Sequence, residues 1–84
     1  MQAPVKICGI RSLKDAKIAF KCGASAIGLI FFKDSKRYIC PSSAAEWIGS
    51  LEPHFKKVGV FVDEEIDIVN SLSDKLGLDF IQLH

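Results

Sequence analysis

The stretch Ala26-Ile-Gly-Leu-Ile-Phe-Phe32 is the longest apolar run of the chain, and it decides the fold. Its seven residues are too few to cross a bilayer, because a membrane-spanning helix needs roughly 20 apolar residues. A short run of aliphatic residues with one glycine and no charge is typical of a strand that is buried on both faces, as in a parallel sheet. We therefore predict such a strand over residues 26–32.

Strand and helix signals alternate on both sides of this run. Ser12 and Asp15 resemble a helix-capping box with Asp in place of Glu, and Gly23 is typical of a helix C-terminus. Pro41 suits the first turn of a second helix, which Pro53 ends. The predicted strands are residues 5–8, 26–32, 57–62 and 79–84, and the predicted helices are residues 12–22, 64–76 and the segment from 41 to Pro53. The order βαβαβαβ indicates an α/β fold with a parallel sheet and helices packed outside it.

The two later helices carry further signals. The helix over residues 64–76 has acidic residues in its first turn, where the helix dipole favours them, and Gly77 closes it. The helix that begins at Pro41 has an apolar stripe at positions i, i+3, i+4 and i+7, which lie on one face of a helix. The stripe consists of Ala44, Trp47, Ile48 and Leu51.

The side chains of the predicted strands fall into two sets, because successive residues of a strand point to opposite faces. One set is uniformly apolar and is expected to pack against the helices. The other set mixes small, large, charged and polar residues, and is expected to line an interior that becomes polar toward the C-terminal ends of the strands. The first set is Val5, Ile7, Ile27, Leu29, Phe31, Val58, Val60, Val62, Ile81 and Leu83. The second set is Lys6, Cys8, Gly28, Ile30, Phe32, Gly59, Phe61, Asp63, Phe80, Gln82 and His84.

This difference between the two faces favours a barrel over an open, doubly wound sheet, which needs aliphatic residues on both faces. A parallel α/β barrel has eight strand–helix units, and the pattern here supplies about three and a half. Scaling the 84 residues to eight units gives ~190 residues, near the lower bound for this fold. We therefore predict that residues 1–84 form slightly less than half of a single (β/α)8, or TIM, barrel domain.

Charge is unevenly distributed, although the net charge is only +1. Residues 1–40 contain eight Lys/Arg and two Asp/Glu, a net +6, and residues 41–84 contain three Lys/Arg and eight Asp/Glu, a net −5. Two interpretations stay open: solvated helix faces, or an anion-binding rim in the first half. The near-neutral total and the lack of interleaved basic and aromatic residues argue against nucleic-acid binding.

The three cysteines, Cys8, Cys22 and Cys40, are odd in number and lack the C-x-x-C spacing. They are expected to be reduced thiols and not a disulfide framework or a zinc site. Basic residues such as Lys6 and Arg11 break up any signal-peptide core near the N-terminus. With no predicted membrane span, we expect a cytoplasmic protein.

Four segments together resemble the phosphoribosylanthranilate isomerase family. They are Val5-Lys-Ile-Cys-Gly-Ile10, Arg37-Tyr-Ile-Cys-Pro41, Val58-Gly-Val-Phe-Val62 and Gln82-Leu-His84, in order and at plausible spacing over essentially the whole chain. The resemblance implies that residues 1–84 are the N-terminal part of a (β/α)8 barrel domain. It implies an enzyme of tryptophan biosynthesis that converts an aminoaldose phosphate to an aminoketose phosphate by an Amadori rearrangement. It implies a phosphosugar substrate, no cofactor and no metal.

The resemblance also implies roles for four residues. Cys8 matches the family's catalytic cysteine, a general base that takes the proton from the sugar C2 carbon, which requires a thiolate near neutral pH. Taken alone, the position of Cys8 favours a small buried core residue. Arg37 matches an arginine that binds the anthranilate carboxylate, and His84 matches a pocket-lining histidine. Gln82 shares the inward parity of His84 and is a weaker pocket candidate, whereas Cys22 and Cys40 match no catalytic role.

The resemblance covers only part of the family's site. The family's general acid, an aspartate after a fifth strand, and its later phosphate-binding loops have no counterpart in these 84 residues. We therefore expect weak or no activity from this chain alone, and self-association or pairing with a missing C-terminal half, because the first and fourth strands are open edges. Two alternatives remain: a self-assembling half-barrel with a binding or structural role, and another phosphosugar-binding barrel enzyme.

Overall fold

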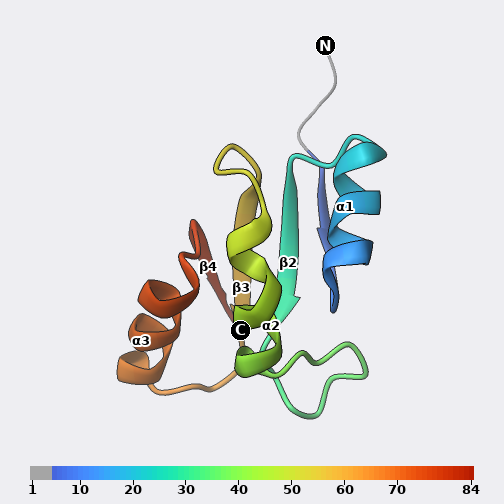
Figure 1. Cartoon of the computed structure of the whole chain (residues 1–84). Coiled ribbons are helices and arrows are strands. Elements are labelled where there is room, and N and C mark those ends of the chain that lie inside the picture. Colours follow the sequence, from blue (N-terminus) through green and yellow to red (C-terminus); the bar gives the residue numbers. More distant parts are fainter. Residues whose placement is uncertain (1–4) are drawn as a thin grey trace.

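The computed structural model describes residues 5–84 and contains one four-stranded sheet. The strands lie in the order β1-β2-β3-β4 and every neighbouring pair is parallel. Figure 1 shows the strands side by side, with α1 at the β1 end and α3 at the β4 end. The elements are β1 (Lys6–Cys8), α1 (Leu13–Lys21), β2 (Ala26–Ile30), α2 (Pro41–Trp47), β3 (Lys56–Phe61), α3 (Ile66–Leu76) and β4 (Phe80–Leu83). The predicted βαβαβαβ order is confirmed; the first four residues of the predicted domain lie outside the described part.

The start and end signals of α1 work as predicted. The Ser12 hydroxyl accepts a hydrogen bond from the backbone N–H of Asp15 at 3.1 Å, which satisfies a donor that the first turn leaves unpaired. Gly23 follows the helix with φ +103°, and Gly77 follows α3 with φ +64°. Both glycines adopt the left-handed backbone that ends a helix, and this conformation is costly for residues with a Cβ.

The boundaries of α2 and α3 differ from the predicted ones. The segment between Pro41 and Pro53 is α-helical only to Trp47 and continues as the short 3-10 helix η1 (Ile48–Ser50). Helix α3 begins at Ile66, so Glu64 and Glu65 precede it, and the acidic residue in its first turn is Asp67.

The strand register shows that one strand faces opposite to the prediction. Paired residues of neighbouring strands point to the same face, and Val58 and Val60 are paired with Gly28 and Ile30 of the inner face. The predicted outward packing of the β3 valines is therefore wrong, and so is the inward placement of Gly59 and Phe61. The in-strand assignments for β1, β2 and β4 are confirmed, since Ile7 pairs with Ile27 and Phe80 pairs with Val58.

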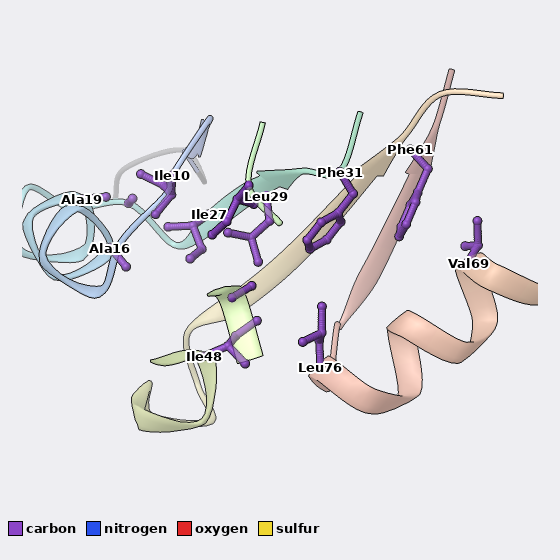
Figure 2. Packing of buried hydrophobic residues seen from close by; sticks show 13 residues of the cluster. Ile10, Ala16, Ala19, Ile27, Leu29, Phe31, Ile48, Phe61, Val69 and Leu76 are labelled. Carbon is purple, nitrogen blue, oxygen red and sulfur yellow. The ribbon is translucent and has the colours of Figure 1, made fainter. Parts of the chain in front are cut away.

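Packing against α3 explains why β3 has this orientation. Phe61 is 1% exposed and its ring centroid lies 5.4 Å from that of Phe31, on the side of the sheet that carries Val69 and Leu76 (Figure 2). Gly59 makes room beneath these rings, because a Cβ there would lie 2.6 Å from Leu78 Cδ1. The alternation of Val with Gly and Phe fits either orientation, so hydrophobicity alone did not separate the two.

The core lies between the sheet and the three helices (Figure 2). The predicted stripe of α2 and η1 faces it: Ala44 and Ile48 are buried, and Trp47 and Leu51 are partly buried against the cluster. The other buried residues of the cluster are Ile10, Ala16, Ala19, Ala24, Ile27, Leu29, Phe31, Ile39, Phe61, Val69 and Leu76.

Strands β1 and β4 each have a neighbour on one side only. Large apolar side chains are exposed there, including Phe80 at 58% and Leu83 at 59%. These open edges are where the sequence predicts association, and an unpaired strand edge is a template for pairing.

Candidate functional site

The candidate site lies at the C-terminal edge of the sheet, where barrels of this type carry their catalytic groups. Cys8 is the last residue of β1, and it is partly buried next to Gly28 of β2. A Cβ on Gly28 would lie 2.7 Å from Cys8 Sγ, so the thiol occupies space that only a glycine leaves free. Gly28 therefore belongs to the site, and its place opposite Cys8 becomes visible only with the register.

Arg37 reaches Cys8 from the loop that follows β2. Its Nη1 donates to the backbone carbonyl of Cys8 at 3.3 Å. Gly9, with φ +86°, lies directly beneath the side chain, since a Cβ there would meet Arg37 Cδ at 2.5 Å. The loop is held by the Ser35 hydroxyl, which accepts from the Arg37 backbone N–H at 3.1 Å, and by the N–H of Ile39, which donates to Ile30 at 3.0 Å.

Gln82 and His84 form a second group at the same edge. Gln82 Nε2 lies 2.7 Å from His84 Nε2, and the Lys6 ammonium donates to Gln82 Oε1. The His84 backbone N–H donates to the Phe61 carbonyl at 2.9 Å, which continues the β3–β4 ladder. The structure therefore joins Gln82 to His84 and adds Lys6, a residue with the same parity as Cys8 that the sequence analysis did not single out.

The four predicted residues thus form two pairs. Cys8 and Arg37 meet through a hydrogen bond, and so do Gln82 and His84. Strand β1 connects the pairs, because Lys6 and Cys8 lie two positions apart and point to the same face.

Cys40 lies outside both pairs, and its thiol has a lowered pKa. The Ser42 hydroxyl, 3.0 Å from Sγ, lowers the pKa of Cys40 below the usual value of a thiol, and the backbone N–H groups of Ser42 and Ser43 add to this effect. Desolvation, and then the nearby Cys40, raise the pKa of Tyr38.

Among residues 5–84, no group of three or more His, Cys, Asp or Glu side chains is arranged to hold a metal ion. No helix in that range is long and apolar enough to span a membrane.

Comparison with known proteins identifies the family. A family profile described as N-(5'phosphoribosyl)anthranilate (PRA) isomerase matches residues 5–84. The chain belongs to this isomerase family. A PRA isomerase from Geobacter sp. (strain M21) is 52% identical over 80 residues, which are 95% of this chain and 39% of that protein. One from Bacillus mycoides is 46% identical over the same shares of the two chains.

Solved PRA isomerases have the same fold. The enzyme from Thermotoga maritima superimposes with a TM-score of 0.94 at 41% identity, over 99% of this chain and 40% of that one. A PRA isomerase crystallised with reduced 1-(o-carboxyphenylamino)-1-deoxyribulose 5-phosphate gives the same TM-score and identity, over 43% of its length. The chain is therefore a partial TIM barrel that spans about 39% of the length of the curated relatives it matches.

Proposed function

We propose that this chain forms the N-terminal part of a phosphoribosylanthranilate isomerase active site of tryptophan biosynthesis. One observation carries the proposal: a cysteine at the end of β1 and an arginine from the loop after β2 meet at the edge of the sheet where this fold does its chemistry. The substrate would be a phosphosugar that bears an aromatic carboxylate. The solved relative supports this class, since its ligand contains a carboxyphenylamino group and a sugar phosphate.

In this proposal Cys8 is the general base. Its thiolate takes the proton from the C2 carbon of the ring-opened C1=N iminium, the electrons of the broken C–H bond form a C1–C2 double bond, and the C1=N pi pair moves to the nitrogen. The resulting enaminol becomes the ketose when its C2 hydroxyl loses a proton and C1 gains one. The reaction needs a thiol that substrate can reach, and Cys8 is only partly buried at the edge of the sheet. The Arg37 guanidinium lies close by, because it donates to the backbone carbonyl of Cys8, and a nearby positive charge favours the thiolate.

Arg37 would bind the anthranilate carboxylate. A guanidinium has five N–H donors in a planar fork, so one donor to the Cys8 carbonyl leaves others for a carboxylate. Gln82 and His84 would line the opposite side of the pocket and contact the substrate through polar atoms.

The remaining chemistry would come from chain beyond these 84 residues. A general acid contributes about 10²–10⁴-fold, and a phosphate site supplies binding energy that is used at the reacting carbon. We therefore expect residues 5–84 alone to show weak or no turnover. The open edges of β1 and β4 would pair with the further strands of the same barrel, in a reducing compartment such as the cytoplasm, consistent with three free cysteines.

A chimera tests the catalytic proposal. Residues 5–84 replace the matching 80 residues of the Geobacter relative, and the loss of phosphoribosylanthranilate fluorescence reports turnover. We expect the chimera to be active, and Cys8→Ala to lower kcat by at least 10²-fold, about the contribution of a general base. Cys22→Ala is the matched control, because Cys22 is an exposed thiol at the end of α1. A Cys8→Ala chimera with undiminished turnover would refute the role of Cys8.

Sedimentation tests the pairing proposal. The 84-residue chain is mixed with a chain that contains the remaining part of the Geobacter relative, and we expect a one-to-one complex with isomerase activity. If the chain forms a stable dimer with itself and ignores that partner, the half-barrel with a binding or structural role is favoured. If the chain stays a stable folded monomer in this mixture, both self-association and pairing with the C-terminal part are refuted.

A further inference from the structure

Lys6, Gln82 and His84 form a chain of hydrogen bonds on the inner side of the sheet. The Lys6 ammonium donates to Gln82 Oε1, and Gln82 Nε2 lies 2.7 Å from His84 Nε2. Lys6 lies on β1 and Gln82 on β4, so the first of these bonds joins the two edge strands. The proposed function gives Lys6 no role.

The chemistry of the three groups fixes the direction of both bonds. An ammonium group has donors and no acceptor, so the Gln82 atom that faces Lys6 must be the carbonyl oxygen. The Gln82 amide NH2 therefore faces His84 and donates to it. His84 Nε2 must then be the acceptor, and a neutral imidazole that accepts at Nε2 has its proton on Nδ1.

Strand pairing holds the backbones of Lys6 and Gln82, while the side chains of Lys6 and His84 are exposed and that of Gln82 is half-buried. The neighbours of Lys6 and Cys8 across the β1–β2 ladder are Ala26 and Gly28, whose small side chains leave room for a lysine to cross the inner face. The backbone of His84 is held at both polar atoms: its N–H donates to Phe61 at 2.9 Å, and its carbonyl accepts from Asp63 at 3.3 Å. With its backbone fixed, the ring's proton position is decided by the Gln82 amide.

We propose that Lys6 is a positioning residue that orients the Gln82 amide and thereby holds His84 as the Nδ1–H tautomer. In this tautomer His84 presents a hydrogen-bond donor to an oxygen of the substrate, and its Nε2 is occupied and takes no part as a base. The contact with substrate rests on the proposed function. The tautomer does not, because it follows from side chains of this chain alone.

Imidazole ¹⁵N chemical shifts of the 84-residue chain test the tautomer directly. The spectrum is recorded at about pH 8.5, roughly two units above the ordinary histidine pKa, where a neutral imidazole has one protonated and one unprotonated nitrogen. We expect His84 to show a protonated Nδ1 and an unprotonated Nε2. His54, the only other histidine, is assigned by its loss in His54→Gln, and the spectrum in urea gives the unconstrained reference. A protonated Nε2 in the folded chain would overturn the proposal.

Three variants test the part played by Lys6. Lys6→Met releases the Gln82 amide, so the His84 signals should shift to a mixture of both tautomers. Gln82→Glu should invert the tautomer to Nε2–H, because both oxygens of a carboxylate only accept. Lys6→Arg retains donors and should retain Nδ1–H. Lys14→Met is the control: it removes the charge of an exposed residue of α1 and should leave the spectrum unchanged.

The outcomes separate the two proposals. An unchanged tautomer in Lys6→Met and in Gln82→Glu refutes the positioning role whatever the chimera does. If the amide spectrum shows that Lys6→Met does not fold, the other two variants test the positioning role. Nε2–H in Gln82→Glu together with Nδ1–H in Lys6→Arg supports it, and any other pair of tautomers refutes it. If the tautomer responds as expected while the chimera has no isomerase activity, the proposed function fails and the positioning role stands.

Discussion

The middle and the edge of the sheet differ in what holds them. Four of the five residues of β2 are buried, and none of the four residues of β4 is. Strand β2 has a partner on each side and the helices over it, whereas β4 has one partner. Cys8 and Gln82 lie on the edge strands β1 and β4, so the candidate site is built on the strands that this chain supports least.

The largest difference should appear when a leucine is truncated in each strand. Leu29→Ala opens a cavity in the core and is expected to cost about 2–5 kcal/mol, because Leu29 is fully buried. Leu83→Ala in β4 is expected to change the free energy of unfolding by about 0.5 kcal/mol, because its side chain already contacts water. Urea denaturation measures both. In the chimera the cost of Leu83→Ala should rise toward that of Leu29→Ala, and equal costs in the isolated chain would contradict the comparison.

A smaller effect is expected from adding a methyl group where the middle strand meets the edge strand. Gly28→Ala forces a Cβ to within 2.7 Å of Cys8 Sγ, and relieving that overlap should cost about 1–3 kcal/mol and displace the thiol. Gly49→Ala is the control, because a Cβ there meets nothing within 4 Å, and its effect should stay within about 0.5 kcal/mol. Urea denaturation gives both costs, and Cys8 alkylation rates report the displacement. A Gly28→Ala chain as stable as Gly49→Ala would mean that β1 moves freely against β2.

The smallest effect concerns Cys40, the residue before α2, whose contacts with Ser42 and Ser43 are local and involve no strand. Hydrogen bonds from Ser42 and Ser43 lower the pKa of Cys40, so its thiolate forms at a lower pH than an ordinary thiol. Alkylation of Cys40 should therefore rise at a lower pH than that of an unstructured thiol peptide. Ser42→Ala should move this midpoint upward, and mass spectrometry of each cysteine follows it. If Ser42→Ala leaves the midpoint of Cys40 alkylation unchanged, the Ser42 hydroxyl does not lower the pKa of Cys40.

The sequence was informative where a pattern has one physical meaning. The helix boundaries were predicted to within a few residues from the cap at Ser12 and from the glycines that follow α1 and α3. The alternation of strand and helix signals predicted the order of the elements. The orientation of β3 was not recoverable in this way, because Val-Gly-Val-Phe-Val is apolar on both faces and only contact between Phe61 and α3 distinguishes them.

The candidate site also contains residues that the sequence predicts and residues that only the structure reveals. Cys8, Arg37, Gln82 and His84 followed from short motifs and a family resemblance. Gly28 and Lys6 did not, because their importance lies in pairings between strands 20 and 76 residues apart in the chain. A residue whose role is to leave space, or to orient another side chain, gives no signal in its own segment.

The bond between Lys6 and Gln82 has a geometrical consequence. Three strand spacings separate β1 from β4, about 14 Å in a flat sheet, and side chains stand upright from such a surface. Two upright side chains on the edges of a flat sheet would stay far apart, so the contact between Lys6 and Gln82 shows that the sheet curves toward its inner face. The curvature that a closed barrel requires is therefore already present in these four strands.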